Sequence, residues 1–232
     1  MSAQEDGKPA GDGKPGGNGK PGGNGKPGGD VPGPVPLGFG DARASVGDHI
    51  AHFFSEEDQR FSVLGPYIET GLRRGDRCVF IAPSKVGTRL CEWLAGEGID
   101  VGGARASGQL IVHPGKATKE EMVDLASRVD AEAQADEEPF IRWSGDGEWA
   151  LGQDMGTSEM LRWETLYDEC SSDWRFLALC QFNRSVFGAD VIMDALRSHP
   201  YCVMGEVVVP NPLSESPAAV REDLHSERHS KR

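Results

Sequence analysis

Six residues of this chain could line a site for a small molecule, because each lies where an apolar segment begins or ends. They comprise two histidines, an arginine, a tryptophan, a cysteine and a glutamine: His49, Arg142, Trp149, Cys180, Gln181 and His199. Together they would offer a mainly apolar surface with a few polar groups, which suits a small ligand that is largely hydrocarbon. Each also has a structural explanation: Cys180 as a small core residue, for example, or His199-Pro200 as the end of a helix.

Known catalytic patterns are missing from the sequence. There is no G-x-x-x-x-G-K-[ST], G-x-S-x-G or H-E-x-x-H, and no G-x-G-x-x-G follows an apolar strand. The first strand-to-helix turn reads FFSEED, without the glycine and lysine that hold phosphates and with three carboxylates that repel them. We therefore predict no catalytic residues and no hydrolysis of ATP. A nucleophilic Cys180 is a distant alternative, because no base lies at a recognisable spacing.

Metal ligands at a familiar spacing are also missing. His49 and His52 are three residues apart, which on a strand places them on opposite faces. No other histidines and cysteines stand at the short intervals typical of zinc sites. From the sequence we expect no metal and no cofactor.

Strands and amphipathic helices alternate over about 170 residues and would position these side chains. The apolar runs that predict strands are His49–Phe54, Arg77–Ala82, Gln109–His113, Phe140–Trp143, Arg175–Phe182 and Tyr201–Val209. Helices are predicted after Ser55, over Val86–Leu94, after Thr118, and over Ser158–Cys170 and Ala189–Ser198. Continuous apolar strands indicate burial on both sides. The expected fold is α/β, a three-layer arrangement with a mostly parallel sheet and helices on both faces.

Charge is concentrated in the middle of the chain. The net charge is −13, and residues 41–212 carry all of it, with 16 Lys and Arg against 29 Asp and Glu. Such a surface repels phosphate backbones and anionic lipids. We expect no direct nucleic-acid binding and no membrane binding.

Composition divides the chain into three parts. Residues 1–40 hold 7 of the 15 prolines and a GKPGGN repeat, and they predict a disordered tail rich in Gly, Pro and Lys. Glycine falls at every third position from Gly13 to Asp30, but six triplets without regular proline favour a solvated linker over a collagen helix. A globular domain is expected over 41–212 and a flexible C-terminal tail over 213–232.

The five cysteines are an odd number without a C-x-x-C pair. The N-terminus has neither the basic nor the apolar region of a signal peptide, and no apolar run is long enough to cross a bilayer. We expect a cytoplasmic protein with reduced thiols.

In order and kind, these segments resemble the MEDS family (methanogen/methylotroph, DcmR sensory domains) over about residues 47–212. The motifs that carry the resemblance are HIAHFF, Gly71–Ala82, Gly98–Leu110, Arg142…Trp149, Trp163-Glu164, Leu179–Asn183, Leu196–Pro200 and Asn211-Pro212. Two positions depart from the family pattern: Asn183 replaces an aspartate, and Leu213-Ser214 replace an aromatic residue. These departures bear on a polar contact and on closure of the pocket, respectively.

The resemblance implies a degenerate RecA/KaiC-like fold without the phosphate loop, and a role in sensing simple hydrocarbon derivatives. We expect a non-enzymatic sensory protein that binds a small organic ligand and regulates a separate effector protein of the regulator, kinase or anti-sigma type, in transcriptional control. Homo-oligomers are compatible with the sequence. The alternative is a ligand-free module on the same fold, whose acidic surface docks a basic partner.

Overall fold

The computed structural model describes residues 33–116, 118–135, 141–152, 156–170, 175–220 and 222. The chain divides into two units, residues 1–31 and 32–232, and the description below concerns the second. Most of both expected tails, 1–32 and 223–232, and Phe140 of the fourth predicted strand lie outside the described residues.

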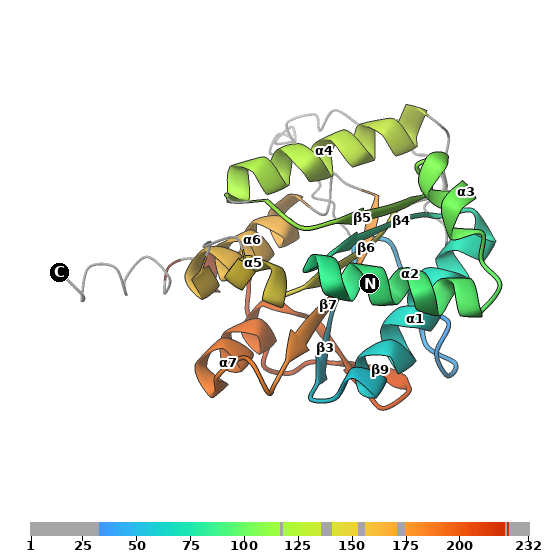
Figure 1. Ribbon diagram of the computed structural model, residues 1–232. Coiled ribbons are helices and arrows are strands. Elements are labelled where there is room, and N and C mark those ends of the chain that lie inside the picture. Colours follow the sequence, from blue (N-terminus) through green and yellow to red (C-terminus); the bar gives the residue numbers. More distant parts are fainter. Residues whose placement is uncertain are drawn as a thin grey trace, which may run out of the picture. The chain divides into compact units, whose positions relative to one another are not determined.

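A seven-stranded sheet forms the centre of the described part, in the order β5-β4-β6-β7-β3-β8-β9 (Figure 1). Its strands are β3 (His49–Phe54), β4 (Arg77–Ile81), β5 (Leu110–His113), β6 (Ile141–Asp146), β7 (Phe176–Asn183), β8 (Tyr201–Met204) and β9 (Val207–Pro210). All neighbours are parallel except β8 and β9. The predicted mostly parallel sheet is confirmed.

Helices cover both faces of this sheet, which confirms the three-layer α/β fold. They are α1 (Glu57–Arg74), α2 (Ser84–Gly96), α3 (Val101–Ala106), α4 (Lys119–Ala135), α5 (Glu148–Gly152), α6 (Gly156–Cys170) and α7 (Ala189–Ser198). Two separate apolar clusters fill the spaces between sheet and helices. One gathers residues of α4, α5, α6 and α7, and the other gathers residues of α1, α2 and α3.

Strand β7 shows how the sequence supplies both clusters. Its first seven residues are buried, and successive side chains point to opposite faces. Phe176, Ala178 and Cys180 belong to the cluster under α4–α7, whereas Leu177 and Leu179 belong to the cluster under α1–α3. A central strand covered on both sides needs this continuous apolar run.

Local structure differs from the sequence prediction at two places. The single strand predicted over Tyr201–Val209 is wrong: Gly205, with φ of 63°, turns the chain back, so that β8 and β9 form a hairpin. The helix after β3 begins with Glu56 as its N-cap rather than Ser55. Gln59, and not Asp58, accepts the backbone N–H groups of Ser55 and Glu56.

The folded unit also includes residues that the sequence assigned to the tails. A short antiparallel pair, β1 (Val35–Pro36) and β2 (Arg43–Ala44), brings Leu37 and Phe39 into the core under α1–α3. At the other end, Glu215 accepts two hydrogen bonds from Arg197, and Val220 is buried.

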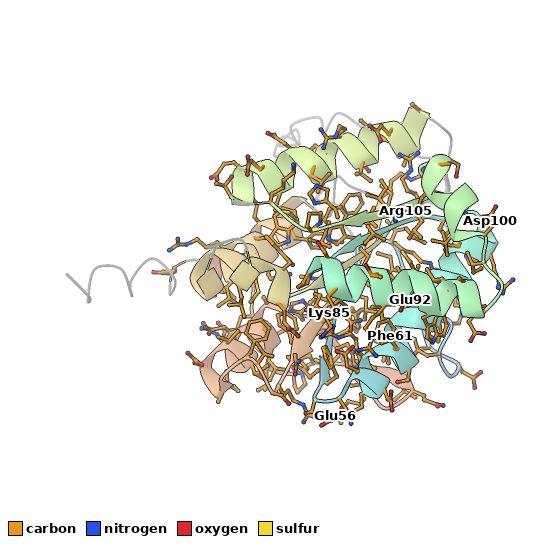
Figure 2. All side chains as sticks on the ribbon, in the orientation of Figure 1. Glu56, Phe61, Lys85, Glu92, Asp100 and Arg105 are labelled. Atoms are coloured by element: carbon orange, nitrogen blue, oxygen red, sulfur yellow. The ribbon has the colours of Figure 1, made fainter. Side chains whose placement is uncertain are left out.

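Several acidic side chains are exposed to solvent. Glu56, Glu92 and Asp100 are exposed (Figure 2), in keeping with the negative charge of residues 41–212. Among the described residues, no helix is both long and apolar enough to span a membrane.

Candidate functional site

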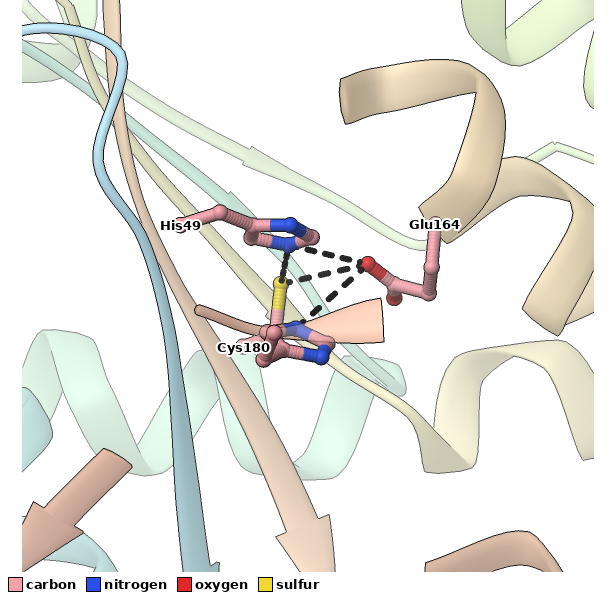
Figure 3. Close-up of side chains that lie close together, drawn as sticks. His49, Glu164 and Cys180 are labelled. Atoms are coloured by element: carbon pink, nitrogen blue, oxygen red, sulfur yellow. Dashed lines mark hydrogen bonds and ion pairs between the residues drawn. The ribbon is translucent and has the colours of Figure 1, made fainter. Parts of the chain in front are cut away.

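Four buried side chains from distant parts of the chain converge beneath α6. They are His49 at the start of β3, Glu164 on α6, Cys180 on β7 and His199 directly after α7, and we call them the tetrad. Each is at most 5% exposed, and one nitrogen, oxygen or sulfur atom from each lies within 4.8 Å of the other three. Figure 3 shows His49, Glu164 and Cys180 pointing toward one another from two strands and a helix.

Sheet register and helix periodicity explain this convergence. Strands β3 and β7 are parallel neighbours, with His49 opposite Ala178 and Ala51 opposite Cys180, so that the side chains of His49 and Cys180 share a face. On α6, Glu164 belongs to the stripe of Met160 and Tyr167, four and three residues away respectively, which faces the sheet.

The distances between the tetrad atoms are short. Nε2 of His49 lies 3.1 Å from Oε2 of Glu164 and 3.3 Å from Sγ of Cys180. Sγ of Cys180 lies 3.5 Å from the same Glu164 oxygen, and Nε2 of His199 lies 3.8 Å from it. The Glu164 carboxylate is therefore the common partner of the other three groups.

The pKa values of the carboxylate and the thiol shift in opposite directions. Burial by itself raises the pKa of Glu164, but the hydrogen bond from His49 and the charges of His199 and His49 outweigh it and hold the pKa below its usual value. Burial, together with the negative charge of Glu164, raises the pKa of Cys180 to about 12. Glu164 is thus a buried anion, and without a further cation Cys180 is a neutral thiol.

Contacts to its ring and to its backbone hold His199 in place. Its Nδ1 atom lies 2.7 Å from the carbonyl oxygen of Ala195, one turn back on α7, which fixes that nitrogen as a hydrogen-bond donor. Asn211, from the closing Asn-Pro pair, donates hydrogen bonds to the carbonyls of Leu196 and His199. The remaining ring nitrogen, Nε2, is directed at Glu164.

Aromatic rings surround the tetrad. The His49 ring lies 4.6 Å from the ring of Tyr167 and 3.9 Å from that of His199, measured between centroids. The Phe182 ring is nearly perpendicular to the His199 ring, at 5.4 Å between centroids. The result is a polar centre inside an aromatic environment, which favours uncharged or fully compensated occupants.

The structure brings together three of the six predicted site residues, namely His49, Cys180 and His199. Arg142 lies on the opposite face of the sheet. Its guanidinium contacts Oδ2 of Asp76 at 2.9 Å and donates hydrogen bonds to the carbonyls of Tyr67 and Pro36. It thereby ties β6 to α1 and to the β1–β2 pair.

Gln181 and Trp149 make other contacts. Gln181 follows Cys180 on β7 and points to the other face, where its Oε1 lies 3.3 Å from Nδ1 of His52. His49 and His52 are thus on opposite faces, as the sequence predicts. Trp149 is buried on α5, and its indole packs so closely on Gly115 that a Cβ there would lie 2.3 Å from Cε3.

An internal ion-pair cluster lies at the carboxyl ends of the strands, the edge at which open α/β sheets generally bind their ligands. Arg60 of α1 is buried and contacts Asp146 at 3.0 Å and Glu148 at 2.7 Å. Asn183 donates a hydrogen bond to the same Glu148 oxygen. The asparagine that replaces the aspartate of the family pattern therefore makes an amide–carboxylate contact here. A cavity of 200 Å³ lies nearby, lined in part by His52, Gln59 and Arg184.

Sequence reasoning missed Glu164 as a site residue. The sequence feature that could have identified it is an acidic residue on the apolar stripe of an amphipathic helix, where a leucine or methionine would be expected. The Trp163-Glu164 pair stood in the family pattern, but on a helix surface such a pair usually serves packing and solvation. Only the tertiary contacts show that Glu164 faces inward.

Comparisons with known proteins relate this chain to a family of sensory domains. Residues 48–200 match the family model described as MEthanogen/methylotroph, DcmR Sensory domain. A relative from Methylorubrum extorquens, named as the transcriptional repressor DcmR, is 31% identical over 153 residues. The match covers 66% of this chain and 58% of the length of that relative. All four tetrad residues fall inside the matched range.

Proposed function

This chain belongs to the MEDS family of sensory domains, and from that premise we propose that it is a cytoplasmic, non-enzymatic sensory protein. It binds a small organic ligand, of the class of simple hydrocarbon derivatives, and regulates a separate effector protein in transcriptional control. A relative named as a transcriptional repressor supports this role.

The buried tetrad carries the proposal. Removing polar and charged groups from water costs free energy, and an apolar core of the same volume would be at least as stable. The fold nevertheless buries two imidazoles, a thiol and a carboxylate at one point inside an aromatic environment. This combination fits a small molecule with an apolar body and one polar group that hydrogen-bonds to the tetrad.

The helices that contribute to the tetrad provide a route for the signal. Glu164 belongs to α6, and His199 is positioned by Ala195 of α7, so a ligand between them and the sheet would change how both helices pack. The effector then recognises the altered outer surface of these helices. No enzymatic step is proposed, because a thiol with a pKa of about 12 is a poor nucleophile at neutral pH.

The alternative function is a ligand-free docking module. It rests on a different observation, the charge of −13 over residues 41–212 with exposed carboxylates such as Glu92 and Asp100. A basic partner would bind this surface with an affinity that falls steeply as salt is added. That partner would bind equally well when the tetrad is altered.

Native mass spectrometry of the purified protein tests the proposal, followed by titration with short-chain alcohols, amines and halogenated hydrocarbons. Quenching of tryptophan fluorescence reports binding, because Trp163 neighbours Glu164 on α6. We expect one ligand per chain, with affinity lost in Glu164→Gln and retained in His52→Asn, whose histidine lies on the other face. No binding of any compound, together with a salt-sensitive protein partner, would favour the docking module.

A further inference from the structure

We propose that the tetrad binds a divalent transition-metal ion of the zinc class, held by Nε2 of His49, Oε2 of Glu164, Sγ of Cys180 and Nε2 of His199. The inference deepens the proposed function, since the same residues form the proposed sensing centre. Metal binding is measured without any organic compound, so that either idea can fail alone.

The spacing of the four atoms fits a tetrahedral ion. Zinc binds nitrogen at about 2.0–2.1 Å and sulfur at about 2.3 Å, so neighbouring ligands of a tetrahedral site lie about 3.3–3.6 Å apart. Four of the six separations in the tetrad are 3.1, 3.3, 3.5 and 3.8 Å, and all six are within 4.8 Å. The two remaining separations both involve His199, so a tetrahedral site requires the His199 ring to move closer to the other three groups.

Donor type and charge indicate zinc. Two imidazoles, a thiolate and a carboxylate are all ligands of this ion, and tetrahedral sites with sulfur and nitrogen donors favour it over Mg²⁺ or Ca²⁺. Two neutral histidines, one thiolate and one carboxylate balance a divalent cation completely. A centre with no net charge suits a location in which every ligand is at most 5% exposed.

The surroundings orient a ligand as metal sites require. A metal-binding histidine commonly donates its other ring N–H to a backbone carbonyl, which fixes the tautomer and directs the free nitrogen at the ion. His199 meets this condition through the carbonyl of Ala195 at 2.7 Å. The backbone of His199 is held in turn by Asn211, so the ligand does not depend on a mobile side chain.

Cobalt and zinc titrations of the full chain test the site. The protein is stripped with a chelator, and bound zinc is then counted by elemental analysis after gel filtration, with the purified protein as isolated measured alongside. Co²⁺ serves as a spectroscopic probe, because a tetrahedral thiolate complex gives intense visible bands and a sulfur-to-metal charge-transfer band. We expect one ion per chain and both spectral features.

Matched variants separate the tetrad from other thiols and histidines. Loss of a group that only orients a ligand already costs about 10–100-fold in metal affinity. We therefore expect loss of a ligand in Cys180→Ser or His49→Asn to weaken zinc binding by at least the upper end of that range, and Cys180→Ser to abolish the charge-transfer band. Cys202→Ser on β8 and His52→Asn on the other sheet face change neither. Circular dichroism checks that each variant is folded, and Glu164→Gln provides a second test that leaves all thiols intact.

The proposal is overturned if the folded wild-type protein takes up less than one zinc per chain at micromolar concentrations. A cobalt complex without the charge-transfer band also overturns it, as does zinc binding that persists in Cys180→Ser and His49→Asn. If the wild-type protein binds no zinc, its binding of organic compounds is still decided by the separate titration with those compounds.

Discussion

The buried histidine opposite the tetrad gives a sharp test of the electrostatic reasoning. Burial lowers the pKa of His52 from its usual 6.5 to about 4, helped by the charges of Arg60 and Arg184 and opposed by the hydrogen bond to Gln181. The folded protein therefore resists protonation in a range where the unfolded chain accepts a proton. His52→Asn removes this titration and keeps a side-chain nitrogen near the position of Nδ1.

The magnitude follows from the two pKa values. Between pH 6.5 and pH 4 the unfolded state binds one more proton than the folded state at this position, so stability falls as the pH is lowered. Each pH unit in this window is worth about 1.4 kcal/mol. The wild-type protein should lose about 1.4 kcal/mol by pH 5.5 through His52, and about 3 kcal/mol by pH 4.

The variant is needed because another group titrates in the opposite direction. Burial raises the pKa of Asp146 from 3.8 to about 7, although the Arg60 guanidinium opposes the shift. Its contribution to stability is complete below about pH 4 and is lost as the pH rises toward 7. The two effects partly cancel in the wild-type protein, but Asp146 contributes equally to both proteins and drops out of their difference.

Urea denaturation of both proteins at pH 7.5, 6.5 and 5.5 measures this difference. The lowest pH stays above the isoelectric point near 4.9, where solubility is poorest. The free energy of unfolding of the wild type, minus that of His52→Asn, should decrease by about 1.4 kcal/mol from pH 7.5 to 5.5. Parallel pH profiles would refute the conclusion that His52 is buried in its neutral form.

Three further predictions concern packing and reactivity. Arg142→Ala removes the buried guanidinium 2.9 Å from the Asp76 carboxylate and leaves the longer, 3.4 Å contact to Arg74. It should cost about 3 kcal/mol in urea unfolding, the low end of the range for a broken buried pair, and a loss below about 1 kcal/mol would contradict the role given to this ion pair. Gly115→Ala places a Cβ 2.3 Å from the Trp149 indole at a φ of 88°, so the protein should unfold at a lower temperature and the near-ultraviolet tryptophan signal should change. Gly47→Ala is the control, because Gly47 also has a positive φ but has open space around it, and its effect on stability measures the backbone strain alone. Maleimide should label the half-buried Cys91 in the native protein, but it should label Cys180 only in denaturant. Rapid labelling of Cys180 in the native protein, found by peptide mapping, would exclude the buried tetrad.

Much of the architecture could be predicted from the sequence, because local patterns and composition determine it. Continuous apolar runs predicted the parallel strands, and helical periodicity predicted α1, α2, α4, α6 and α7. The acidic FFSEED turn without glycine or lysine excluded a phosphate loop before any fold was known. The period of two along β3 separated His49 from His52, and the structure places them on opposite faces.

The proximity of the four tetrad residues is determined by the tertiary structure. These residues stand at positions 49, 164, 180 and 199, so no local spacing connects them, and their proximity depends on strand order and on the packing of α6 against the sheet. Alternation along the strands separates Arg142 and Gln181 from their neighbours, which face α4–α7, and tertiary packing decides that the face of Arg142 is the one covered by α1. A sequence states which side chains alternate along a strand. Which strands become neighbours, and hence which alternate residues meet, is fixed only when the whole core is packed.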